Sequence, residues 1–66
     1  MDMIRVSSTA ISAIGYDPIT MRMKILFVQG HTYDFCSVPA HVFNELLNAR
    51  SKGSYYNDRI RDRYPC

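Results

Sequence analysis

A chain of 66 residues has room for one small domain, because a chain this short buries only about 60% of the surface that its unfolded form exposes. Hydrophobic residues make up 47% of the chain and charged residues 21%, a composition that excludes a disordered or fibrous protein. The net charge of +2 is too small to demand a nucleic-acid partner. It is unevenly spread, since residues 50–66 hold five basic and two acidic residues and residues 1–49 hold three basic and four acidic ones. The C-terminal end is therefore basic.

The two cysteines, Cys36 and Cys66, are too few for the disulfide framework of a small secreted domain. We therefore expect Cys36 to be an inert buried residue and Cys66 a free thiol that forms adventitious dimers in air. The first ten residues contain no apolar run of signal-peptide length, and the longest apolar stretch, residues 25–28, is far too short to cross a membrane. These features predict a cytoplasmic protein without membrane contact.

The first half of the chain alternates apolar and polar residues with a period near two, which is typical of half-buried strands. Residues 10–16 predict a first strand that ends at Asp17-Pro18, where proline fixes φ in a turn. Residues 21–28 predict a second strand, and Gln29-Gly30 marks a hairpin turn before a third strand at residues 31–36. One face of the second strand is apolar: Met21, Met23, Ile25 and Phe27.

The second half changes to a period near 3.6, which predicts helices. Ser37 is expected to cap a first helix that has Pro39 in its first turn and ends at about Arg50. Residues 51–53 interrupt the pattern, and Ser54 is expected to cap a second helix that ends at about Arg61. The apolar positions of the two helices are Val38, Val42, Phe43, Leu46, Leu47, Tyr56 and Ile60.

These elements predict one α+β domain over residues 1–66: a three-stranded antiparallel β-meander followed by two short α-helices packed on one face. The turn between the second and third strands decides where Tyr33 and Phe35 point. A two-residue turn would expose both rings beside basic side chains, as in sheets that stack RNA bases, whereas a turn that also includes His31 would put both rings in the core. The first choice buries the carboxylate of Asp34 at high cost, so the pattern favours the core without excluding the stacking surface.

Patterns for catalysis and metal binding are weak. The residues that could hold a metal have no zinc-knuckle spacing: His31, Cys36, His41 and Cys66. A nucleophilic pair of Cys36 and His41 lacks an orienting group, and the three glycines form no phosphate-binding loop. We therefore predict that the chain is not an enzyme and has no catalytic residue, bound metal or cofactor.

Residues 51–64 mix cations with aromatic rings, which is where a local function would concentrate. Cations there are suited to phosphates and tyrosines to stacking on bases, together with one tyrosine of the third strand. Because Asp58 and Asp62 alternate with the arginines, a solvated surface of weak ion pairs fits the same pattern. The candidate nucleic-acid contacts are Lys52, Tyr55, Arg59, Arg61, Arg63 and Tyr33.

Seven short motifs follow one another along the chain: Ser7-Ser8, Ile14-Gly15-Tyr16-Asp17-Pro18, Tyr33-Asp34-Phe35, Val38-Pro39, Ser51-Lys52-Gly53-Ser54-Tyr55-Tyr56-Asn57, Ile60-Arg61 and Tyr64-Pro65. Their order resembles the KTSC domain over about residues 6–65. In the resemblance, Tyr33 and Phe35 match a central Tyr-x-Tyr motif, with Phe35 lacking the second hydroxyl. The C-terminal motif is matched by Ser51, Lys52, Gly53, Tyr55, Tyr56, Asn57, Ile60 and Arg61.

The KTSC domain is also found at the C-terminus of some lysyl-tRNA synthetases and as small bacterial and phage-encoded proteins, so the resemblance implies an RNA-binding module. We therefore expect a small non-enzymatic module that binds RNA or single-stranded nucleic acid through the basic and aromatic C-terminal segment. The alternative is a bacterial or prophage-encoded protein-interaction module without a nucleic-acid role, which docks a host protein through its helices or an open sheet edge. The sequence leaves the oligomeric state open.

Overall fold

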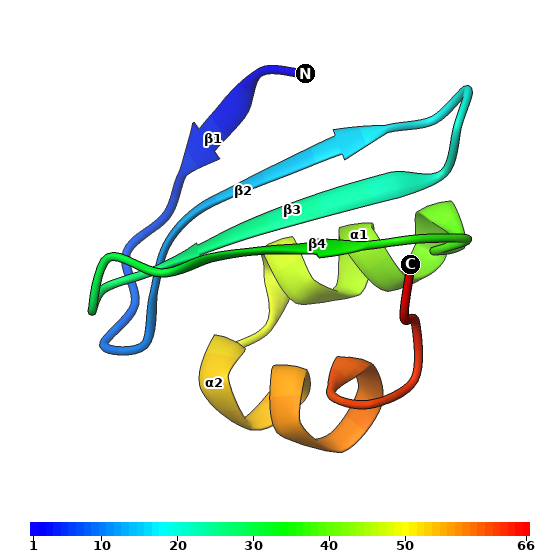
Figure 1. Cartoon of the computed structure of the whole chain (residues 1–66). Helices are drawn as coiled ribbons and strands as arrows, with labels where there is room; N and C mark the ends of the chain where they lie inside the picture. Colours follow the sequence, from blue (N-terminus) through cyan, green and yellow to red (C-terminus); the bar gives the residue numbers. More distant parts are fainter.

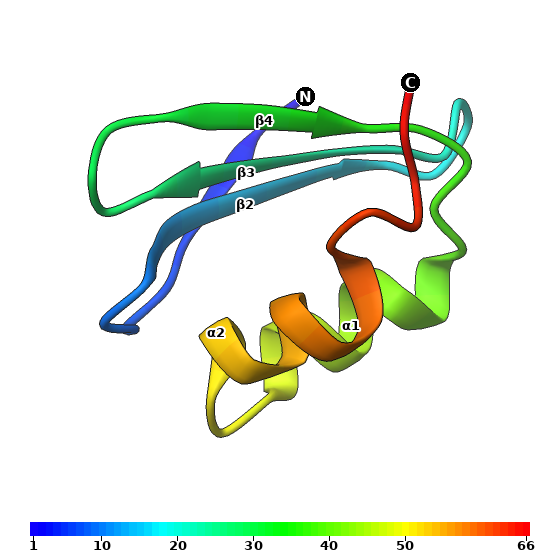
Figure 2. The same cartoon turned by 60° about the horizontal axis from the view of Figure 1, so that its bottom comes forward.

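An antiparallel sheet forms one layer of the molecule, and the helices lie against one of its faces (Figures 1 and 2). The structure is a computed structural model that describes all 66 residues. The strands lie side by side in sequence order: β1 (Met3–Arg5), β2 (Ile11–Asp17), β3 (Arg22–Phe27) and β4 (Thr32–Phe35). The meander predicted for the last three strands is confirmed, and so is the packing of helices on one face.

The sheet has one strand more than predicted, β1 at its edge. Met3 pairs with Gly15 of β2, and Arg5 pairs with Ala13. Strand β1 is short and all of its residues are exposed, so it carries none of the alternation from which a half-buried strand is recognised. A Cβ at Gly15 would lie 2.7 Å from the sulfur of Met3, the flexible end of a side chain on β1, which would have to move aside for a larger residue. The prediction of three strands is therefore wrong by one.

The turn that follows β2 is built around Asp17, as predicted. Its Oδ1 accepts a hydrogen bond from the backbone N–H of Ile19 at 2.9 Å, and its carbonyl accepts one from the N–H of Met21 at 2.7 Å. The hydrogen bond from Ile19 is the main reason that the pKa of Asp17 lies below its ordinary value of 3.8. Met21 is exposed with a φ of 60°, so its predicted place in the core is wrong.

The turn between β3 and β4 has three residues, Val28–Gly30. It is closed by the N–H of Phe27, which donates to the carbonyl of His31 at 2.9 Å. Gly30 has a φ of 103°, a conformation that favours glycine. Both registers considered from the sequence are wrong. The turn has three residues, as in the alternative that includes His31, but it begins one residue earlier, at Val28. His31 therefore lies outside the turn.

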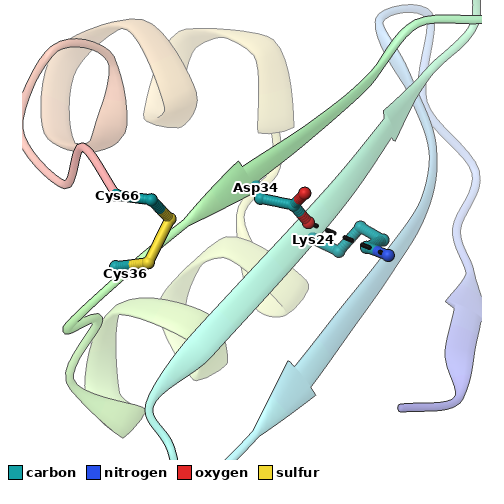
Figure 3. Close-up of a disulfide and its surroundings, with 4 residues drawn as sticks. All are labelled: Lys24, Asp34, Cys36 and Cys66. Carbon is teal, nitrogen blue, oxygen red and sulfur yellow. Dashed lines mark ion pairs between the residues drawn. A yellow bond between two sulfur atoms is a disulfide. The ribbon is translucent and has the colours of Figure 1, made fainter.

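Because of this register, both aromatic residues of β4 point toward the helices. Ile25 lies opposite Tyr33, on the face that is covered. Phe35 is buried, as the favoured alternative predicted, but Tyr33 is 52% exposed because it lies at the uncovered end of the edge strand. Asp34 points to the other face, where its carboxylate lies 3.8 Å from Nζ of Lys24 (Figure 3). The predicted exposure of Asp34 is confirmed.

Helix α1 (Ala40–Asn48) begins after Pro39, which is its N-cap residue and makes no side-chain capping bond. The prediction of Ser37 as the cap is wrong, because its backbone has a φ of 55° in the bend that precedes the helix. Val42 and Leu46 are buried, as their spacing on one helix face predicts. The hydroxyl of Tyr16 on β2 donates to the carbonyl of Val38 at 2.6 Å and joins the sheet to the start of this helix.

Helix α2 (Lys52–Tyr55) continues directly into η1 (Tyr56–Ile60), a π-helical turn closed by the N–H of Arg61, which donates to the carbonyl of Tyr56 at 2.8 Å. The cap of α2 is Ser51, whose Oγ accepts from the N–H of Ser54 at 3.3 Å. The predicted cap at Ser54 is therefore wrong by three residues. None of these helices combines the length and the apolar character needed to cross a membrane.

The core lies between the sheet and the helices. Strands β2, β3 and β4 and the helical elements α1 and η1 contribute residues to it. The alternating and helical patterns of the sequence therefore predict most of the core. Its nine residues are Ile11, Ile14, Met23, Ile25, Phe35, Val38, Val42, Leu46 and Ile60.

A disulfide joins Cys36, directly after β4, to Cys66 (Figure 3). The N–H of Cys36 also donates to the carbonyl of Tyr64 at 3.1 Å, so the C-terminal segment lies beside the end of β4. The expectation of a free thiol at Cys66 is wrong. No local spacing signals this pair, because the two cysteines are 30 residues apart and only the fold of the helical segment brings them together. Both thiols are consumed by this bond.

Candidate nucleic-acid interface

The six residues predicted from the sequence do not line one hollow but are divided among three, two of which share Tyr64 as a lining residue. We call these the hydroxyl hollow, with a volume of about 420 Å³, the Tyr55 hollow, of about 350 Å³, and the aromatic hollow, of about 330 Å³. The residues divide as follows: Lys52 in the hydroxyl hollow; Tyr55, Arg59 and Arg63 in the Tyr55 hollow; Tyr33 and Arg61 in the aromatic hollow.

The aromatic hollow lies between β4 and the end of η1. Its rings are held at fixed angles: Tyr33 meets Phe27 edge to face with ring centres 5.5 Å apart, and Tyr56 meets Phe27 in the same way at 5.0 Å. Tyr56 also lies 6.0 Å from Phe35. Burial raises the pKa of Tyr56 above its ordinary value of 10.0. Tyr33 is thus an exposed ring that packs against Phe27.

Arg61 supplies the positive charge of the aromatic hollow. Its Nε lies 3.9 Å from a carboxylate oxygen of Asp62, and both side chains are largely exposed. A solvent-exposed ion pair of this kind contributes about 0–1 kcal/mol, so it does not hold the guanidinium in place. Arg61 is thus the one cation that lines this hollow beside Tyr33, and the acidic residues Asp34 and Asp62 line it as well.

At the Tyr55 hollow, Tyr55 makes a hydrogen bond within the fold. Its hydroxyl donates to Oε1 of Glu45 at 2.7 Å and links α2 to α1. Burial of the ring, followed by the hydrogen bond and the charge of Glu45, raises the pKa of Tyr55 to about 12. Arg59 and Arg63 are exposed at the same hollow, together with Asp58. Tyr55 is half-buried, so Tyr33 is the more open ring of the two.

Most of the C-terminal motif has a role in holding the fold. Ser51 caps α2, and Ile60 is completely buried. Gly53 allows α2 to approach the chain before β2, because a Cβ there would lie 3.2 Å from the Cβ of Ala10. The side chains of Asn57 and Arg61 are exposed, so these two motif residues have no such supporting role. The spacing of Tyr56 and Ile60 predicts that they anchor this segment, and the structure packs both against the core, so only the cap residue was placed three residues too late.

Comparison with known proteins supports the same fold and motif order. Residues 7–64 match the family model described as the KTSC domain. A protein of Tsukamurella paurometabola is 41% identical over 59 residues, which cover 89% of this chain and 88% of that protein. A crystal structure of a KTSC domain protein from Yersinia pestis superimposes with a TM-score of 0.92 at 32% sequence identity, covering 96% of this chain and 89% of that one.

The chain is also similar to part of a larger protein. A lysine–tRNA ligase of a Nostoc species is 32% identical to it over 62 residues, which are 94% of this chain but 11% of the ligase. A lysine–tRNA ligase of Nostoc punctiforme is 29% identical over 62 residues, again 11% of that enzyme. The similarity is thus to a small segment of each ligase.

Proposed function

This chain belongs to the KTSC domain family, and from that membership and the geometry of the aromatic hollow we propose that it is a small non-enzymatic module that binds RNA or single-stranded nucleic acid. In this proposal Tyr33 stacks on a base and Arg61 contacts a neighbouring phosphate. The observation that carries it is the presence of an exposed ring and an available guanidinium in one hollow.

Stacking suits an unpaired strand, because every base has a flat face and the contact tolerates any sequence. A guanidinium binds phosphate oxygens through a planar pair of N–H groups, which gives a charge-assisted contact. The two groups of the aromatic hollow are thus complementary to one nucleotide of an exposed strand.

A path for further nucleotides leads past Tyr64, which lines both the aromatic hollow and the Tyr55 hollow. A strand on this path would meet Arg59 and Arg63 after Arg61. Tyr55 and Lys52 stay in the proposal as flanking groups, since the first donates its hydroxyl to Glu45 and the second lines the hydroxyl hollow. The similarity to segments of lysine–tRNA ligases supports RNA as the ligand, although the ligase activity itself is not part of the proposal.

The test is fluorescence anisotropy of labelled single-stranded RNA, tRNA and duplex DNA at several salt concentrations. A plot of the logarithm of the association constant against the logarithm of the salt concentration should have a slope of about −2 if three arginines contact phosphates. The slope should be about −3 if Lys52 makes a fourth contact. The double variant Tyr33→Ala/Arg61→Ala should bind single-stranded RNA at least about tenfold more weakly.

The matched control is Arg5→Ala, which removes an exposed arginine from β1, at the opposite edge of the sheet from β4. This variant should bind as the unaltered chain does, and all three proteins should unfold at similar urea concentrations. A slope near zero, or an equal loss in Arg5→Ala, would contradict the proposal.

A second candidate function, a protein-interaction module, is favoured by an apolar hollow between β1 and α1. It has a volume of about 610 Å³, and Ile4, Tyr16 and Phe43 are among the residues that line it. The outer edge of β1 is unpaired, so an extended peptide could add to the sheet there and place a side chain in the hollow. The unaltered chain should then capture a partner protein from nuclease-treated lysate, and Ile4→Glu should not. Loss of every captured partner when nuclease is added would rule out a protein-interaction module.

A further inference from the structure

The hydroxyl hollow brings together two segments from opposite ends of the chain. One is the loop between β1 and β2, and the other is the connection from α1 into α2. Its lining contains no hydrophobic residue and no carboxylate, and it consists mainly of hydroxyl groups and two cations: Ser7, Ser8, Thr9, Arg50, Ser51 and Lys52. A hollow of this composition is unsuited to an apolar ligand and is rich in hydrogen-bond donors.

The hydroxyl proton of Ser8 is not used by the hydrogen bonds within its loop. Its Oγ accepts hydrogen bonds from the N–H groups of Ala10 at 3.1 Å and Ile11 at 3.2 Å. A hydroxyl has two acceptor sites and one proton, so these two bonds leave the O–H to donate elsewhere. Ser7 and Thr9 flank it and are exposed, so the loop presents three neighbouring hydroxyl groups.

The two cations of the hollow have no carboxylate partner. The ion pairs of the structure are Lys24 with Asp34 and Arg61 with Asp62. Nζ of Lys52 donates to the carbonyl of Ala49 at 3.1 Å, which holds the ammonium in place and leaves two of its protons free. The positive charge of Arg50 and Lys52 is therefore uncompensated within the fold.

The walls of the hollow are held close together. At Gly53 a Cβ would lie 3.2 Å from that of Ala10, so α2 packs directly against the loop. The loop is fixed at its start by the N–H of Val6, which donates to the carbonyl of Ser12 at 3.0 Å. The backbone of the two walls is thus held in place, while the side chains of Ser7, Thr9 and Arg50 remain exposed.

We propose that the hydroxyl hollow binds the phosphate group of a phosphomonoester. Such a group carries about two negative charges and only acceptor oxygens, and it is complementary to two cations and to the hydroxyl donors of Ser7, Ser8 and Thr9. The hydroxyl of Ser51 is not among these donors, because it donates to Oγ of Ser54 at 3.0 Å. The inference shares only Lys52 with the proposed function, because Tyr33, Tyr55, Arg59, Arg61 and Arg63 do not line this hollow. The phosphate belongs either to a free phosphorylated small molecule or to the end of a nucleic-acid strand.

The first experiment is a titration of the ¹⁵N-labelled chain with inorganic phosphate at constant ionic strength, with chloride as the replaced anion. Saturable shifts should be confined to the amides of residues 7–9 and 50–53. Arg50→Gln should weaken the binding about tenfold, because it removes a charge-assisted contact from an exposed side chain. Arg22→Gln, which removes the same charge at the other end of the β2–β3 hairpin, should leave it unchanged.

The second experiment compares ribose 5-phosphate with a 5′-phosphorylated and a 5′-hydroxyl trinucleotide. Tighter binding of the phosphorylated trinucleotide identifies a strand end as the source, and equal or tighter binding of ribose 5-phosphate identifies a small molecule. Shifts that do not saturate, or an unchanged dissociation constant in Arg50→Gln, overturn the inference. Tyr33→Ala/Arg61→Ala should keep the phosphate shifts, so a failure of RNA binding in that variant is separable from a failure here.

Discussion

The hydroxyl of Tyr55 donates to Oε1 of Glu45 across 2.7 Å and fastens α2 to α1. Tyr55 was selected from the sequence as a ring for stacking on a base, and the structure gives it a partner inside the fold. The bond predicts measurable effects on stability that do not depend on any ligand.

Removing this hydroxyl should cost little but detectable stability. We expect Tyr55→Phe to lower the free energy of unfolding by about 1 kcal/mol, because the ring stays packed and Glu45 is left in solvent. Urea denaturation at pH 7 measures the effect. Tyr33→Phe, which removes a hydroxyl from a more exposed ring, is the matched control and should change the stability less.

The same hydroxyl predicts a loss of stability at alkaline pH. The pKa of Tyr55 is raised to about 12 in the folded chain, against an ordinary value of 10.0, so folding favours the protonated phenol. The resulting stability is fully present below pH 10 and is lost as the pH rises from 10 toward 12. Urea denaturation across this range should show a weaker decline in Tyr55→Phe, and equal declines in both proteins would contradict the assignment.

Asp17 predicts the opposite behaviour at acid pH. Its pKa lies below 3.8 in the folded chain, mainly because the N–H of Ile19 donates to the carboxylate, so folding favours the charged form. Its contribution to stability is present above its ordinary pKa and disappears as the pH falls through the folded value. Asp17→Asn keeps an acceptor oxygen but does not titrate, so the free energy of unfolding of this variant should depend less on pH below the ordinary pKa of Asp17. Urea denaturation at acid pH measures this dependence. An NMR titration that gives the Asp17 carboxyl an ordinary pKa would refute the prediction.

The disulfide should contribute substantially to the stability of a chain this small. Cys66→Ser is expected to lower the free energy of unfolding by about 3–4 kcal/mol, the loop-entropy value for cysteines 30 residues apart. Urea denaturation under oxidising conditions measures it. Added dithiothreitol should bring the unaltered chain close to the stability of the variant and should leave the variant itself unchanged.

Ile60 anchors the π-helical turn in the core. Its side chain is completely buried, so Ile60→Ala should cost about 2–5 kcal/mol through lost burial and the cavity that remains. Ile19→Ala, at a side chain that is 91% exposed, is the matched control and should be close to neutral. Thermal unfolding followed by circular dichroism compares the two, and similar midpoints would contradict the core position of Ile60.

The predictable part of this fold is the part with a repeating pattern. Met23 and Ile25 alternate with polar residues on β3, and Val42 and Leu46 lie one helical turn apart on α1, so their burial follows from spacing alone. Strand β1 has no such alternation, and its pairing with β2 is visible only in three dimensions. Ser51 and Ser54 are equally good caps by residue type, so sequence could not choose between them.

The candidate site was predictable in composition but not in arrangement. The sequence identifies the cations and rings of residues 51–64, but it does not show which hollow each of them lines, and Arg59 and Arg61, two residues apart, line different ones. The hydroxyl hollow was missed because it joins residues 7–9 to residues 50–53, which are more than 40 positions apart. The signal that could have found it was the presence of Ser7-Ser8 and Ser51-Lys52-Gly53 in one motif set.

The bond between Cys36 and Cys66 closes the backbone from one to the other into a covalent ring that contains α1, α2 and η1. A protease that cuts once inside this ring, for example in the connection between α1 and α2, opens it without releasing either fragment. The nicked molecule keeps its mass, apart from one added water, until a reductant separates the pieces. A cut in the loop between β1 and β2 has no such protection, and the edge strand is then held by hydrogen bonds and side-chain contacts alone.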